Sequence, residues 1–156
     1  MRRILVVDDS MTMRALYRQI LSHIARTSLT FAADGVQALE CVERSEPHLM
    51  FLDINMPRMN GLEVLKELGQ RGVLARTAVV LVSTEGKDDD LRRGRDAGAT
   101  EYLRKPFAMN ALAPIVERLV PAALAGAEPA PAGAGPETRG VVLRGGEGAL
   151  GASGRQ

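Results

Sequence analysis

Features that mark several classes of protein are scarce in this 156-residue sequence. It has a single cysteine, Cys41, so no internal disulfide can form, which is typical of a protein in a reducing cytosol. The 20 Lys and Arg residues nearly balance the 19 Asp and Glu residues, and this argues against a general affinity for nucleic acid or acidic membranes. The apolar run at 4–7 is far shorter than a signal-peptide core or the roughly 20 residues that cross a membrane. We therefore expect a soluble, cytoplasmic protein whose electrostatic function is local.

Short apolar runs alternate with longer segments of helical spacing up to about residue 120, and this pattern predicts a parallel sheet covered by helices. The predicted strands are 4–8, 28–32, 49–53, 78–83 and 101–104. The predicted helices are 13–24, 36–44, 62–68, 89–97 and 111–120. Ser10, Asp34 and Asn60 stand where they can cap the first three helices, and Asn110 precedes the last, which has Pro114 near its first turn. The predicted fold class is α/β, with a five-stranded, doubly wound parallel sheet.

The composition changes after Val120. Residues 122–156 are dominated by Ala, Gly and Pro, with "VVL" as a short apolar stretch. A chain of this kind buries too little surface to offset the entropy lost on ordering. We expect one domain over residues 1–121 and a disordered tail over residues 122–156.

Polar side chains close four of the five predicted strands. Asp8 and Asp9 end the first strand, Asp53 the third and Ser83 the fourth, and Lys105 follows the fifth. In a sheet of this class, ligands bind beyond the carboxyl ends of the strands. Three neighbouring carboxylates raise one another's pKa unless a cation neutralises them, and oxygen ligands suit Mg²⁺ in a site shared with phosphate. The sequence therefore predicts a Mg²⁺ site at this edge.

Each of these residues has an ordinary explanation when it is taken alone. Asp8 and Asp9 could form a turn and a helix cap, Asp53 could begin a turn, Ser83 could cap a helix, and Lys105 could be a surface residue. Four strand ends with these side chains together are improbable by chance, so the combination carries the prediction. A flavin or nucleotide site is disfavoured, because "DDSMTMR" lacks the Gly-rich loop that lets backbone amides approach a phosphate.

The stretches "ILVVDDS", "FLDINMPRMNG", "VVLVSTEG" and "DAGATEYLRKPF" resemble the response-regulator receiver domain over about residues 1–121. The resemblance implies the flavodoxin-like, CheY-like fold. It implies that Asp53 is the phosphate acceptor, which forms an acyl phosphate with a phosphoryl group from a partner's phosphohistidine. It also implies that Asp8, Asp9 and Asp53, with the backbone carbonyl of Asn55, hold Mg²⁺.

The same resemblance implies a switch. Ser83 matches the hydroxyl that moves to a phosphoryl oxygen, and Lys105 matches the lysine that pairs with the phosphate. Pro106 suggests the family's cis peptide, because the cis form costs little before proline. Tyr102 matches the aromatic residue that turns inward on activation.

The resemblance implies a single-domain response regulator that is phosphorylated by a histidine kinase or a histidine phosphotransferase and then switches its protein-binding face. That face would be the fourth helix, fifth strand and fifth helix, where Arg92, Arg93 and Arg95 either contact an effector or are simply solvated. We expect a monomeric switch rather than an enzyme, with no DNA or membrane partner. The alternative is a phosphate sink or phosphorelay shuttle without an effector of its own.

Asn55 and Glu85 resemble the chemotaxis branch of the family and favour that pathway. They predict that the acyl phosphate is lost by self-catalysed hydrolysis in seconds to minutes. Thr84 departs from the commonest pattern, in which a smaller Ala or Gly follows the switch residue, and its methyl group could narrow access to the phosphate. His23 and His48 have no partner at metal-ligand spacing, so we expect neither to bind a metal.

Overall fold

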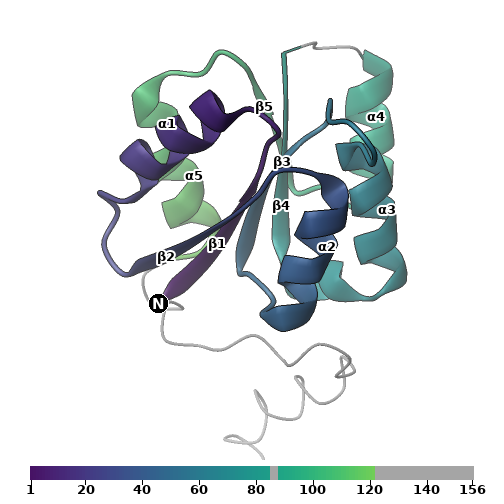
Figure 1. Cartoon of the computed structure of the whole chain (residues 1–156), viewed down its shortest axis with the longest axis horizontal. Helices are drawn as coiled ribbons and strands as arrows, with labels where there is room; N and C mark the ends of the chain where they lie inside the picture. Colours follow the sequence, from purple (N-terminus) through teal and green to yellow (C-terminus); the bar gives the residue numbers. More distant parts are fainter. Residues whose placement is uncertain (85–87, 122–156) are drawn as a thin grey trace, which may run out of the picture.

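The computed structural model describes residues 1–84 and 88–121, which form a five-stranded sheet with helices on both faces (Figure 1). The strands are β1 (Arg2–Val7), β2 (Thr27–Ala32), β3 (Leu49–Asp53), β4 (Ala78–Ser83) and β5 (Glu101–Arg104). The helices are α1 (Met11–Leu21), α2 (Gly35–Arg44), α3 (Gly61–Gln70), α4 (Asp88–Asp96) and α5 (Leu112–Leu119), with 3₁₀ turns at Val73–Ala75 and Met109–Ala111. All neighbouring strands are parallel, in the order β2-β1-β3-β4-β5. The predicted fold class is confirmed, while Glu85 and the expected tail lie outside the described residues.

An apolar cluster lies on each face of the sheet. α1 and α5 cover one face, around Tyr17, Phe51 and Leu112, and α2, α3 and α4 cover the other, around Met50 and Leu65 (Figure 1). β3 is buried at every position because it is central and covered on both sides. The strand order reverses between β1 and β3, so the carboxyl ends of these two strands border the crevice where ligands bind in such sheets.

Three of the expected helix caps are present. The side chains of Ser10, Asp34 and Asn60 each accept a hydrogen bond from the backbone N–H three residues later, at the starts of α1, α2 and α3. The side chain of Glu63 also accepts from the Asn60 N–H, which completes a capping box. Each such cap contributes about 1 kcal/mol to stability, so the starts of these helices are fixed by local sequence.

One helix end differs from the prediction by more than two residues. α1 ends at Leu21 rather than at Ile24, and Ile24 packs against the α1 and α5 cluster from a turn, which is why the apolar spacing continues past the helix. α5 follows a 3₁₀ turn that contains Asn110, and Ala111 precedes the helix without a side-chain cap. Asn110 therefore does not cap α5, whereas Pro114 lies in its first turn as expected.

A buried ion pair links the segments that lead into β3 and β4, at the end of the sheet opposite the carboxyl edge. Arg76 donates two hydrogen bonds of 2.8 Å to the two carboxylate oxygens of Glu46, and both side chains are at most 2% exposed. Local sequence patterns do not indicate this pair because its members are distant in the sequence. Among the described residues, no helix combines the length and the apolar character needed to cross a lipid bilayer.

Candidate functional site

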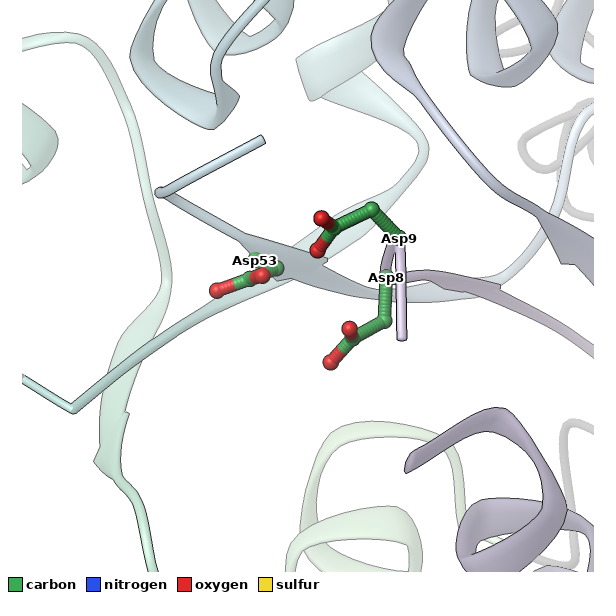
Figure 2. A group of neighbouring side chains, drawn as sticks. All are labelled: Asp8, Asp9 and Asp53. Carbon is green, nitrogen blue, oxygen red and sulfur yellow. The ribbon is translucent and has the colours of Figure 1, made fainter. Parts of the chain in front are cut away.

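Three aspartates meet at the carboxyl edge of the sheet, where the strand order reverses. Asp8 and Asp9 follow β1 directly, and Asp53 is the last residue of the adjacent strand β3. Their carboxylates lie around one small region (Figure 2), and one oxygen of each lies within 4.8 Å of the others. Asp8 and Asp53 are buried, whereas Asp9 is exposed. The cluster is therefore open to solvent on the side of Asp9.

Alternation along the strands explains why these side chains share a face. Val6 and Phe51 belong to the apolar cluster beneath α1 and α5. Asp8 and Asp53 come two residues later, so they continue the same face beyond the end of the cluster. Lys105 likewise comes two residues after Leu103, the β5 residue that packs against that cluster. Strand periodicity alone thus brings two acids and one base together.

The ammonium group of Lys105 lies against two of the three carboxylates. Its Nζ donates to Oδ2 of Asp8 at 2.8 Å and lies 3.6 Å from Oδ1 of Asp53. The backbone N–H of Lys105 donates to the Ser83 carbonyl at 2.8 Å, and the Lys105–Pro106 peptide is cis, as the resemblance implied. One ammonium cannot balance three carboxylates, so the four groups carry two net negative charges when all are ionised.

Asp8 is also held by residues of the loop into α1 and of α1 itself. The Ser10 N–H donates to Oδ1 of Asp8 at 2.9 Å, and Nη1 of Arg14 donates to the Asp8 carbonyl at 2.7 Å. Arg14 was not among the site residues predicted from the sequence. The signal that could have found it is its position one turn into a helix that starts directly after the acidic pair.

Asp53 stands in an unfavourable environment for a charged carboxylate. Burial raises the pKa of Asp53 to about 6, and the neighbouring charge of Asp8 acts in the same direction. The ammonium of Lys105 lowers this pKa, whereas the charge of Asp9 raises it further. The backbone N–H of Asn55 donates to the carboxylate and also lowers its pKa. At neutral pH the carboxylate is ionised at a cost in free energy that a bound cation would remove.

Tyr17, on the buried face of α1, lies beneath this site. Its ring centroid is 5.5 Å from that of Phe51 and 5.6 Å from that of Phe107. Burial, followed by the charges of Asp8 and Asp53, raises the pKa of its phenol, which therefore stays neutral. Helical spacing could predict the burial of Tyr17 but not its closeness to the acids.

Ser83 ends β4 and is fully buried. Its Oγ accepts a long hydrogen bond of 3.4 Å from Nδ2 of Asn55, which lies in the loop between β3 and α3. Ile54, at the start of that loop, donates its N–H to the Val82 carbonyl at 3.0 Å. The hydroxyl of Ser83 is therefore next to the loop that leaves Asp53. Thr84 follows it and is exposed.

The loop between β3 and α3 folds back against Asp53. The Gly61 N–H donates to the Ile54 carbonyl at 2.9 Å. A Cβ atom at Gly61 would lie 2.3 Å from the Asp53 carbonyl oxygen, so a side chain at position 61 would displace the backbone of Asp53. The close approach requires glycine, and it fixes where the loop begins and ends relative to the site.

Tyr102 lies apart from the acidic cluster, on β5, where it pairs in register with Leu81. It is half-buried and borders a cavity of about 130 Å³ whose lining also includes Leu91 and Arg95 of α4. Arg92, next to Leu91, forms an exposed ion pair of 3.6 Å with Asp89. The predicted switch aromatic thus has space beside it, between α4 and the edge of the sheet.

The donor groups fit a hard divalent cation. Mg²⁺ binds carboxylate oxygens at 2.0–2.1 Å, so its octahedron spans roughly 4.2 Å from one ligand to the opposite one. The aspartate oxygens lie within 4.8 Å of one another, so small side-chain rotations would bring all three around one ion. The two net negative charges of the cluster match the charge of the ion.

His48 and Cys41 make contacts elsewhere in the fold. Nδ1 of His48 accepts a hydrogen bond of 2.9 Å from the Arg3 N–H, which ties the start of β3 to β1. Cys41 is buried in α2, and burial raises the pKa of its thiol. Both lie outside the acidic cluster.

Comparisons with known proteins agree on one family. The family model described as "Response regulator receiver domain" matches residues 4–117. The response regulator MprA of Mycobacterium leprae is 40% identical over 110 residues, which cover 70% of this chain and 47% of that protein. The chain thus spans about half the length of this relative.

Two solved structures extend the comparison. The chemotaxis protein CheY4 of Vibrio cholerae gives a TM-score of 0.72 with 29% identity, over 77% of this chain and 99% of that one. The Mn(2+)-bound form of response regulator Rcp1 gives a TM-score of 0.66 with 28% identity, over 76% of this chain and 91% of that one.

Proposed function

Because this chain belongs to the family of response regulator receiver domains, we propose that it works as the receiver of a two-component system and accepts a phosphoryl group on Asp53. The observation that carries the proposal is the site itself: Asp53 is buried at a strand end, with Asp8, Asp9 and the ammonium of Lys105 around it. The protein acts as a monomeric cytoplasmic switch, and its chemistry is confined to its own phosphorylation and dephosphorylation.

The transfer needs few groups. An Asp53 oxygen attacks the phosphorus of a phosphohistidine on a kinase or phosphotransferase, and the P–N bond breaks as the O–P bond forms, with its electron pair left on the imidazole nitrogen. Such transfers depend on positioning and on neutralising the charge that spreads over the phosphoryl oxygens. Lys105 is placed for this role, because its Nζ lies 3.6 Å from an Asp53 oxygen.

Asp8, Asp9, Asp53 and the backbone carbonyl of Asn55 would hold Mg²⁺, which supplies positive charge to the transferring group. The spacing of the three carboxylates supports this assignment. A solved receiver relative, Rcp1, is described as Mn(2+)-bound, and Mn²⁺ favours the same oxygen ligands.

Phosphorylation adds negative charge and acceptor oxygens at Asp53. The Ser83 hydroxyl exchanges its long hydrogen bond with Asn55 for a bond that it donates to a phosphoryl oxygen. Tyr102 turns inward, and the cavity of about 130 Å³ that it borders gives the ring room to move. The face formed by α4, β5 and α5 changes shape as a result, and this face, which carries Arg92, Arg93 and Arg95, binds the effector.

The direct test is metal-dependent labelling with acetyl phosphate, followed by intact mass. We expect wild type to gain one phosphoryl group in Mg²⁺ and none after chelation, and Asp53→Asn to gain none. Asp96→Asn is the matched control, because Asp96 is an exposed aspartate at the end of α4. Labelling of Asp53→Asn at the wild-type rate would refute the assignment of the acceptor.

The pathway we propose is chemotaxis. It is supported by Asn55 and by the likeness to CheY4, because the match covers 99% of the CheY4 chain. The alternative is a phosphate sink or shuttle. A pull-down with beryllofluoride, a mimic of the phosphoryl group, separates the two functions. Phosphate-dependent capture of a motor or effector protein supports the switch. Capture of a kinase or histidine phosphotransferase alone supports the sink.

A further inference from the structure

A second group of contacts holds the loop between β3 and α3. Nη2 of Arg58, in this loop, lies 2.6 Å from Oδ2 of Asp34. Asp34 is the N-cap of α2, and its other oxygen accepts from the Gln37 N–H at 2.9 Å. One carboxylate therefore closes the start of α2 and also binds the loop that leaves the phosphate-acceptor strand.

The backbone at Arg58 is unusual. Its φ is 68°, in the left-handed region that residues other than glycine seldom adopt. The next residue, Met59, packs so closely on the first residue of α2 that a Cβ atom at Gly35 would lie 2.8 Å from its Cβ and Cγ. The loop is thus pressed against α2 by an ion pair and a packing contact at consecutive positions.

Stability accounts for only part of this arrangement. Asp34 is 12% exposed, but the Arg58 side chain is 62% exposed, and an ion pair with an exposed partner contributes little to folding. A left-handed arginine costs free energy, and residues held in such conformations cluster at functional sites. Asn55, whose carbonyl is an expected metal ligand, lies in the same loop. The hydrogen bond between Ile54 and Gly61 holds the chain just before Asn55, and the ion pair of Arg58 holds it three residues later.

We propose that Arg58 and Asp34 form a latch that positions the Asn55 carbonyl for Mg²⁺; this inference rests on the proposed function. Mg²⁺ demands a nearly ideal octahedron at 2.0–2.1 Å, so a small displacement of one carbonyl weakens its binding. Arg58 and Asp34 are positioning residues, because they act through the loop rather than on the phosphoryl group.

The test is a Mg²⁺ titration of Arg58→Gly, followed by amide shifts in ¹H–¹⁵N NMR spectra. We expect the dissociation constant to rise about tenfold, as for other residues that orient metal ligands. Acetyl phosphate labelling should be slower at low Mg²⁺ and return to the wild-type rate at saturation. Glycine relieves the left-handed conformation, so the urea midpoint should stay equal or rise. A purely structural role for Arg58 would instead lower the midpoint and leave Mg²⁺ affinity unchanged.

The sign of the change separates the latch from simple electrostatics. Removing the positive charge of Arg58 would by itself leave Mg²⁺ binding unchanged or tighten it, whereas loss of the latch weakens it. Asp34→Asn removes the ion pair and keeps a helix cap, since Asn caps as well as Asp, and should also weaken binding. Arg71→Ala is the matched control, because Arg71 makes an exposed ion pair of 3.3 Å with Glu43 of α2 and should bind Mg²⁺ as wild type does.

Each outcome bears on a different claim. An unchanged or tighter dissociation constant in Arg58→Gly overturns the latch and leaves the proposed function standing. If wild type itself shows no Mg²⁺-dependent shifts at the acidic cluster, the metal site of the proposed function fails, and the latch fails with it.

Discussion

Replacing Asp53 with Asn should stabilise the metal-free protein in a pH-dependent way. Burial and neighbouring acids raise the pKa of this carboxyl from 3.8 to about 6. One pKa unit corresponds to 1.36 kcal/mol, so a charged Asp53 costs the folded state up to about 3 kcal/mol. Asn is nearly isosteric, carries no charge, and can still accept the backbone hydrogen bond from Asn55.

The direction follows from the order of proton release. Below pH 3.8 the carboxyl is protonated in both the folded and the unfolded chain, so it adds no penalty. Between pH 3.8 and about 6 the unfolded chain loses its proton first, and the free energy of unfolding of wild type falls as the pH rises. Above pH 6 the full penalty is present.

Urea unfolding at a series of pH values, without divalent ions, measures this effect. We expect Asp53→Asn to exceed wild type by up to about 3 kcal/mol near neutral pH and to converge with it near pH 4. Other titrating groups are common to both proteins, so the difference isolates Asp53. Mg²⁺ at 100 times the dissociation constant should stabilise wild type by about 2.7 kcal/mol, which would nearly cancel the difference.

A difference that does not vary with pH would refute the reasoning, as would an Asp53→Asn protein that is less stable than wild type near neutral pH. Asp96→Asn tests whether the loss of any aspartate has the same effect. Because Asp96 is exposed, its replacement should change stability by less than about 0.5 kcal/mol.

Three further predictions concern the loop, the far end of the sheet and the lifetime of the phosphate. Gly61→Ala places a Cβ against the Asp53 carbonyl oxygen, so both the urea midpoint and the labelling rate should fall, and an unchanged labelling rate would contradict the close approach. Glu46→Gln leaves Arg76 buried without its charged partner and should cost about 3–5 kcal/mol in urea unfolding, while the folded protein still accepts phosphate at the wild-type rate. The acyl phosphate should decay in seconds to minutes and faster still in Thr84→Ala, whereas a half-life of many hours in the purified protein would exclude self-catalysed hydrolysis.

The parts of the fold that sequence could predict are those set by short-range rules. Caps at Ser10, Asp34 and Asn60 depend on a side chain and a backbone N–H three residues apart, and all three are present. The convergence of Asp8 and Asp53 depends only on strand periodicity and on parallel neighbours. It was predictable once the alternation of strands and helices had been recognised.

Contacts between distant segments could not be predicted in this way. The Glu46–Arg76 pair and the Asp34–Arg58 pair each join two loops whose relative positions depend on the packed sheet. No local pattern marks either partner, because charged residues in loops are ordinarily solvated. The end of α1 was predicted three residues too late for a related reason: Ile24 packs against the cluster beneath α1 and α5 from a turn, and helical spacing alone does not distinguish this from a longer helix.

The surroundings of Asp8 and Asp53 also bear on which of them accepts phosphate. Both oxygens of Asp8 receive hydrogen bonds, one from the Ser10 N–H at 2.9 Å and one from Lys105 at 2.8 Å. Asp53 accepts from the Asn55 N–H, and the ammonium lies 3.6 Å away, beyond the length of a good hydrogen bond. Its raised pKa makes Asp53 more basic than an ordinary aspartate, and its lone pairs are less committed to donors. These different environments support the proposed division of roles, in which Asp8 would hold the metal ion and Asp53 would attack phosphorus.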